Sequence, residues 1–211
     1  MPTPWDDSVK NQTIKDLGVF AGPDLKKEPA WGPAMFAKIL DEFNKLSSTY
    51  GLGVTLSASL LSPKTTSSGA EIQIEVSSGS HRFVLDGQTQ TGTLPGTFAG
   101  ITHKVIQGGM IQKAFSFVPA RPMIAGRGIG NGAKIALALH ELLHAIGLDD
   151  TDPGHITGLD DPDLFDGIPN LDANYPPDGN PGDRLDFGHG KYAPPYFLTA
   201  RTAGLVRSIW S

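Results

Sequence analysis

The sequence predicts a single α+β domain, because helical patterns flank a run of strand patterns in a chain of ordinary composition. The 211 residues are 39% hydrophobic and 18% charged, which is typical of a globular domain with one substantial core. Apolar residues recur at the helical period after Pro33 and alternate every second residue in parts of the region 54–118. We therefore expect one domain over residues 1–211.

The first predicted elements are a short strand and an amphipathic helix. Residues 13–20 form the strand candidate, among Pro, Gly and charged neighbours. The helix begins near Pro33, a residue that helices tolerate in their first turn, and ends before Gly51 and Gly53. Its apolar face consists of Phe36, Ile39, Leu40, Phe43 and Leu46.

The middle of the chain predicts a sheet. Residues 54–60 and 70–76 alternate apolar and polar side chains, as strands with one buried face do. Three further strand candidates cover residues 81–85, 98–106 and 110–118, and glycines separate them.

A buried helix and a C-terminal helix complete the predicted domain. Residues 133–146 are apolar nearly all round, which indicates a buried helix. The glycine-rich residues 126–132 lack the Lys-Ser/Thr of a phosphate-binding loop, so we interpret them as a helix start capped near Asn131. Residues 151–190 form an Asp-, Gly- and Pro-rich loop insertion, too polar for a core of its own, and residues 199–210 form the last helix.

Composition argues against several classes of protein. A net charge of −5 without clustered Lys or Arg argues against nucleic-acid binding. No apolar run approaches the roughly 20 residues of a transmembrane helix, so we expect no membrane segment. Cysteine is absent, so any metal would be held by histidine and carboxylate. The first ten residues lack a signal-peptide pattern, which leaves the compartment open.

The most specific pattern is H-E-x-x-H, formed by His140, Glu141 and His144 in the predicted buried helix. Residues four apart share one helix face, so both imidazoles can reach one zinc ion at about 2.0–2.1 Å. Glu141 lies beside them, within reach of water at the metal. Ionisable groups buried on this apolar helix without partners would each cost several kcal/mol, which favours a metal pair with a base.

A catalytic zinc site needs a third protein ligand. No Glu follows Glu141 in the chain, so the ligand is Asp or His. Gly147 suits the left-handed turn that ends a helix and would direct Asp150 back toward the ion. We therefore predict Asp150 as the third ligand. The alternatives are His155, His189 and Asp149.

The spacing H-E-x-x-H-x-x-G-x-x-D resembles the metzincin zinc proteases, with Asp in the last position as in the snapalysin group of small bacterial enzymes. The order of predicted elements is similar to that of matrixin-like catalytic domains. The resemblance implies a twisted, mixed five-stranded sheet with the amphipathic helix, the zinc helix and a C-terminal helix. It also implies a secreted zinc endopeptidase whose protein or peptide substrate lies extended beside the edge strand, here residues 98–106. We expect a monomer.

The predicted chemistry follows from these residues. Zinc would lower the pKa of water toward about 7, and Glu141 would take the proton as the hydroxide attacks a peptide carbonyl. The same Glu would return the proton to the leaving nitrogen. Family resemblance implies a tyrosine that stabilises the oxyanion; Tyr192 is the candidate ahead of Tyr196, and packing is its alternative role.

Two alternatives remain open from the sequence. Asp161, Asp163 and Asp166 precede Gly167 with the spacing of a calcium loop, but the Glu that closes an EF-hand is missing, and Asp and Gly are also ordinary turn residues. The second alternative is a non-catalytic binding or structural module that keeps the metal helix for stability. Metzincins carry a methionine beneath the zinc, and no Met follows Met123, which keeps this alternative open.

Overall fold

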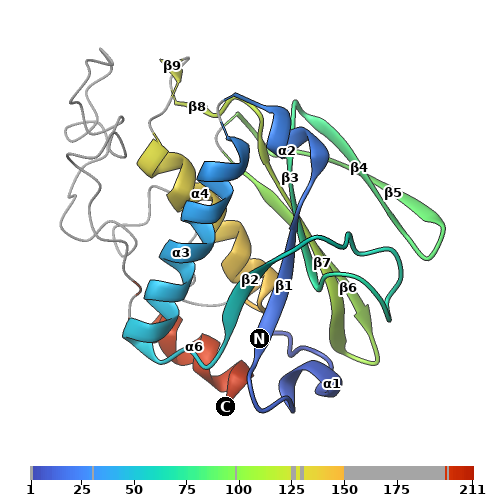
Figure 1. The fold of residues 1–211 in the computed structure, drawn as a ribbon, viewed down its shortest axis with the longest axis vertical. Helices are drawn as coiled ribbons and strands as arrows, with labels where there is room; N and C mark the ends of the chain where they lie inside the picture. Colours follow the sequence, from blue (N-terminus) through green and yellow to red (C-terminus); the bar gives the residue numbers. More distant parts are fainter. Residues whose placement is uncertain are drawn as a thin grey trace.

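A five-stranded sheet forms the centre of the computed structural model, which describes residues 2–29, 31–97, 99–124, 127–128, 131–149, 198 and 200–211. The strands are β1 (Asp16–Ala21), β2 (Thr55–Ser59), β3 (Ile72–Ser77), β6 (Ile101–Gln107) and β7 (Met110–Pro119). Their order is β2-β1-β3-β7-β6 (Figure 1). All neighbours are parallel except β6, which runs antiparallel to β7. The α+β class, the mixed five-stranded sheet and the edge position of the strand predicted at 98–106 are confirmed.

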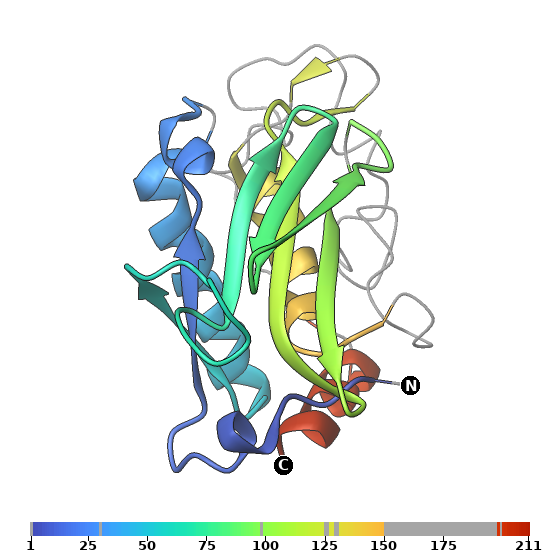
Figure 2. The ribbon, with the colours of Figure 1, turned by 90° about the vertical axis from the view of Figure 1, so that its right-hand side faces the viewer.

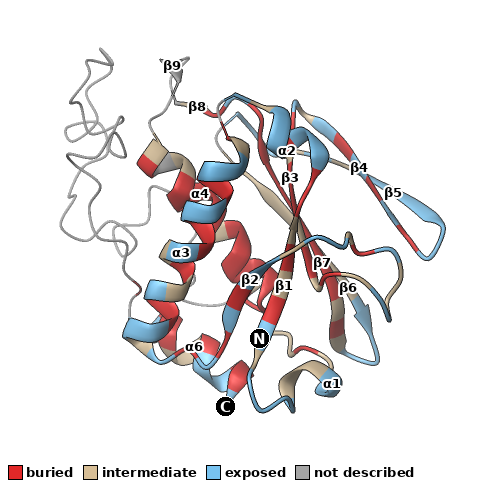
Figure 3. Cartoon of the chain, in the orientation of Figure 1, coloured by how far each residue is buried: buried red, intermediate tan, exposed pale blue. Residues whose placement is uncertain are grey.

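Three helices contribute to the main core, and two of them, α3 (Gly32–Tyr50) and α4 (Asn131–Ala145), pack directly against the sheet. Both lie on the same face (Figures 1 and 2). The third helix, α6 (Ala200–Trp210), contacts the ends of both, since Arg207 donates to the carbonyl of Tyr50 and the Trp210 indole donates to the carbonyl of Ile146. Apolar residues of the helices and the sheet form one core between the layers (Figure 3). These helices correspond to the three predicted ones.

The other face of the sheet carries a hairpin of β4 (Ser80–Leu85) and β5 (Gln88–Thr93) (Figure 2). A second apolar cluster joins the hairpin to β7 and consists of Phe83, Leu85, Phe115 and Phe117. The strand predicted at 81–85 is therefore present, but it belongs to this hairpin and not to the main sheet. No pattern predicts β5, because its side chains are polar and almost all exposed.

The remaining elements are too short to show a period in sequence. They are α1 (Asp7–Lys10), α2 (Pro23–Lys27), β8 (Met123–Ile124) and β9 (Arg127–Gly128). None of the helices in the described part of the chain has the length and apolar character needed to cross a membrane.

Two histidines pack together between the hairpin and the sheet. The Nε2 atoms of His81 on β4 and His103 on β6 lie 2.8 Å apart. The ring of His81 stacks on Phe117 with 3.9 Å between centroids, and its Nδ1 is buried without a hydrogen-bond partner among the described residues. Burial lowers the pKa of both imidazoles, and the proximity of His103 lowers that of His81 further. Both shifts favour the neutral form of the pair.

Acidification is expected to destabilise the fold through this pair. Because both pKa values lie below the usual value of 6.5, the unfolded chain binds more protons, and the free energy of unfolding falls as the pH drops below that value. Urea unfolding of the metal-free protein at about pH 8 and about pH 5.5 measures the effect. His81→Phe should reduce the pH dependence; an unchanged dependence would show that the pair does not contribute.

Candidate metal centre

The helix α4 buries most of the predicted metal motif. The residues next to the motif in this helix, Leu139, Leu142 and Leu143, belong to the core. Glu141 is 2% exposed and His144 is 6% exposed, whereas His140 is half-buried. Because buried polar side chains are stable only with partners, the contacts of these groups define what the site can do.

The two imidazoles of the motif converge through their Nε2 atoms, which lie 3.1 Å apart. Two ligands of a tetrahedral zinc ion, each at about 2.0–2.1 Å, are separated by about 3.3 Å. The Nδ1 of His144 lies 3.1 Å from the carbonyl oxygen of Leu148, and since a carbonyl can only accept, this nitrogen carries the proton. In the neutral ring, the Nε2 of His144 then presents its lone pair toward His140, as metal-binding histidines do.

A tight turn at Gly147 ends the helix, as the sequence predicts. Gly147 has a φ of 128°. Its N–H donates to the carbonyl of His144 at 3.0 Å, and the N–H of Leu148 donates to that of Leu143 at 3.1 Å. These two hydrogen bonds define a Schellman motif. The turn leads the chain away from the helix directly before the predicted third ligand.

Glu141 lies against the edge of the sheet, next to β6. The hydroxyl oxygen of Thr102 is 2.8 Å from Glu141 Oε2 and 3.0 Å from the Glu141 carbonyl oxygen, and Ser116 Oγ is 2.9 Å from the same hydroxyl. A Cβ at Gly100 would lie 2.5 Å from Cγ and Oε1 of Glu141. The carboxylate is therefore oriented by Thr102 and accommodated by Gly100, two residues that no sequence pattern identifies.

Asp149 contacts two other segments of the chain. Its Oδ1 pairs with the Lys104 amine of β6, and its Oδ2 accepts a hydrogen bond from Thr3 Oγ1 at 3.1 Å. Both oxygens are thus engaged by the edge strand and the N-terminal segment. Asp149 is accordingly a poorer candidate for the third ligand than its position in the sequence suggests.

The other predicted site residues lie outside the described residues. They are Asp150, His155, His189, Tyr192 and Tyr196, together with Asp161, Asp163 and Asp166 of the calcium hypothesis. Within the described ranges, no group of three or more His, Cys, Asp or Glu side chains is arranged to hold a metal ion. The third ligand and the calcium site remain predictions.

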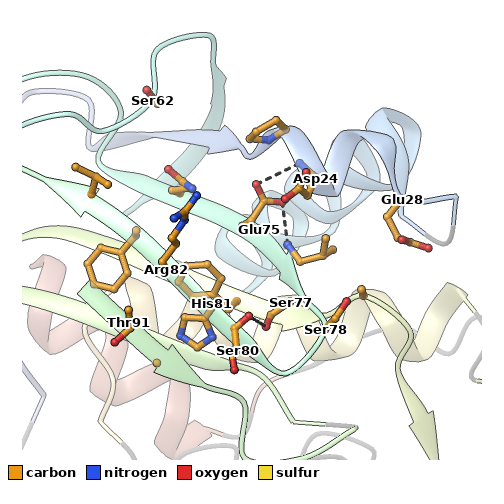
Figure 4. Close-up of a pocket in the computed structure, with 18 of the residues that line it drawn as sticks. Asp24, Glu28, Ser62, Glu75, Ser77, Ser78, Ser80, His81, Arg82 and Thr91 are labelled. Carbon is orange, nitrogen blue, oxygen red and sulfur yellow. Dashed lines mark hydrogen bonds between the residues drawn. The ribbon is translucent and has the colours of Figure 1, made fainter. Parts of the chain in front are cut away.

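A cavity of about 1450 Å³ lies on the opposite side of the sheet, between α2, β3 and β4 (Figure 4). Charged residues of both signs line it, including Asp24, Glu75 and Arg82. The Glu75 carboxylate accepts hydrogen bonds from the N–H groups of Asp24 and Leu25 at the start of α2, and burial raises its pKa. We interpret Glu75 as a structural acid that caps α2, because its oxygens are used within the fold.

Neither the models of known protein families nor the sequences of curated proteins match this chain. The described residues provide two converging imidazoles, a buried carboxylate on the same helix and an edge strand that contacts this carboxylate.

Proposed function

We propose that the chain is a zinc-dependent endopeptidase with a metzincin-like fold, which hydrolyses peptide bonds in protein or peptide substrates. The observation that carries the proposal is the convergence of the His140 and His144 Nε2 atoms at 3.1 Å, with Glu141 adjacent in the same helix. A purely structural zinc site more often has four protein ligands and has no use for a neighbouring base. The combination therefore favours catalysis over a metal-stabilised binding module.

Each residue has a distinct role in this proposal. His140, His144 and the predicted ligand Asp150 hold the ion. When bound, zinc polarises the peptide carbonyl and makes water more acidic. Glu141 accepts a proton from the attacking water and returns it to the leaving nitrogen. Tyr192 is proposed to stabilise the oxyanion.

The edge strand β6 supports an extended peptide as substrate. Of the strands that the structure describes, β6 pairs only with β7 in the main sheet. Its outer edge therefore offers backbone donors and acceptors to an added strand. Gly100, directly before β6, contacts the Glu141 side chain, so a peptide along this edge would pass the proposed base.

Purification followed by elemental analysis and a cleavage assay tests the proposal. The wild-type protein is expected to hold one zinc per chain and to cleave an unfolded protein such as casein. A chelator should stop cleavage, and added zinc should restore it. A wild-type protein without stoichiometric metal would exclude the proposed site.

The third ligand can be identified with two substitutions. Asp150→Ala is expected to lower zinc affinity strongly because it removes one of the three proposed ligands, whereas His155→Ala should retain the metal. Competition with a chromophoric chelator measures both dissociation constants. Retention in Asp150→Ala together with loss in His155→Ala would assign the ligand to His155 instead.

A further inference from the structure

Lys104 is a largely buried cation on the edge strand, on the side that faces α4. Its side chain is 12% exposed. The amine donates a hydrogen bond to the carbonyl oxygen of Leu148 at 2.8 Å and pairs with the carboxylate of Asp149. Both acceptors lie directly after the turn that ends α4. A lysine that is removed from water in this way requires such partners, so its position is well defined.

The Leu148 carbonyl links Lys104 to the metal ligands. This oxygen also accepts the hydrogen bond from the Nδ1 of His144 at 3.1 Å. One carbonyl thus binds both the lysine amine and the imidazole that is proposed to hold zinc. Any movement of the Leu148 carbonyl would change the orientation of the His144 ring and the direction of its Nε2 lone pair.

The N-terminal segment holds the same turn from another side. The Thr3 N–H donates to the carbonyl of Gly147 at 2.8 Å, and the Thr3 hydroxyl donates to Asp149 at 3.1 Å. The indole of Trp5 donates to the carbonyl of Ala145 at 3.0 Å. Residues 145–149 are therefore fixed by two segments that are far away in sequence, and the next residue in the chain is Asp150.

We infer that Lys104 is a positioning residue for the metal centre: it fixes the Leu148 carbonyl, and this carbonyl holds the His144 ring in the orientation that directs its Nε2 at the ion. This inference rests on the proposed function for the presence of zinc. Thr102 of the same strand orients Glu141, so β6 would have two positioning roles. The edge strand would then position both the base, Glu141, and one proposed metal ligand, His144.

Electrostatics and positioning predict opposite effects when the lysine is removed. A nearby positive charge repels a dication, so its loss alone would tighten zinc binding. Loss of a group that orients ligands would instead weaken binding, and changes around the ligands of metal sites commonly do so by about 10–100-fold. The sign of the change in affinity therefore distinguishes the two effects.

The test compares Lys104→Met and Lys104→Arg with the control Lys113→Met. Lys113 is a buried lysine on β7 that is 4% exposed and whose amine donates to the carbonyls of Gly69 and Ala70, away from the motif. Zinc dissociation constants come from chelator competition, and the visible spectrum of the cobalt(II)-substituted protein reports the ligand geometry. Urea unfolding of each metal-free variant shows whether it is folded.

We expect Lys104→Met to raise the zinc dissociation constant by about 10–100-fold and to alter the cobalt spectrum. Lys104→Arg should recover most of the affinity, and Lys113→Met should bind zinc like the wild type. Unchanged or tighter zinc binding in Lys104→Met would overturn the inference. Zinc binding that is weakened equally in Lys104→Arg and Lys104→Met would also overturn it. If the variants show these zinc affinities but the wild type cleaves no peptide, the proposed endopeptidase activity is refuted and the positioning role of Lys104 is retained. A wild type that binds no zinc would refute both.

Discussion

Glu141→Gln is expected to lower peptide-bond cleavage by about 10²–10⁴-fold, the usual contribution of a positioned general base. The amide is nearly isosteric with the carboxylate but cannot accept the proton from water. Its oxygen can still accept a hydrogen bond from Thr102, whose hydroxyl lies 2.8 Å from Glu141 Oε2. The side chain should therefore keep its place next to Gly100, and zinc content should be unchanged, since Glu141 is a base and not a ligand in this proposal.

Initial rates on a protein substrate, normalised to the zinc content of each preparation, measure the effect of Glu141→Gln. Glu75→Gln is a matched control, because Glu75 is another buried glutamate, 8% exposed, whose carboxylate accepts hydrogen bonds from the backbone N–H groups of Asp24, Leu25 and Val76. It should cleave like the wild type. Equal activity of Glu141→Gln and the wild type would remove the proposed mechanism. If the wild type and both variants bind zinc but none of them cleaves the substrate, the non-catalytic module is favoured.

The periodic elements of the fold could be predicted because their apolar residues face one core. The face that defines α3 in sequence, from Phe36 to Leu46, is buried in the structure. The alternation in β3 likewise places Ile72 and Ile74 in the same core. By contrast, β5 has no buried face of its own, and the assignment of β4 to a separate hairpin depends on its contacts with Phe115 and Phe117. The apolar periodicity of a strand does not determine which distant segment it pairs with.

The motif residues of the site could be predicted from local spacing, whereas their partners could not. His140, Glu141 and His144 lie within one helical turn and a half, so the helix alone brings them together. Thr102 and Lys104 lie on a strand some forty positions earlier in the chain and reach α4 only because β6 forms the edge of the sheet beside it. Both look like ordinary polar residues of a half-exposed strand. Their roles depend on tertiary packing.

Gly147→Ala is expected to reduce both stability and zinc binding. The residue has a φ of 128°, and an added Cβ would lie 2.6 Å from the carbonyl oxygen of Thr3 and 2.8 Å from Cδ1 of Ile209. Left-handed backbone costs an L residue about 1–2 kcal/mol, and overpacking costs about 1–3 kcal/mol more. We therefore expect the free energy of unfolding to fall by about 2–5 kcal/mol. Movement of the turn would also displace the Leu148 carbonyl, which holds the Nδ1 of His144.

Gly51→Ala separates these two contributions. Gly51 ends α3 with a φ of 59°, and an added Cβ there would meet no atom within 4 Å. That substitution should cost only the backbone term of about 1–2 kcal/mol and leave zinc bound, because α3 carries none of the proposed ligands. Urea unfolding and zinc content of the two variants give the comparison. If Gly147→Ala is no less stable than Gly51→Ala and retains zinc, the contact with Thr3 does not constrain the turn, and the ligands must be held in place by other parts of the chain.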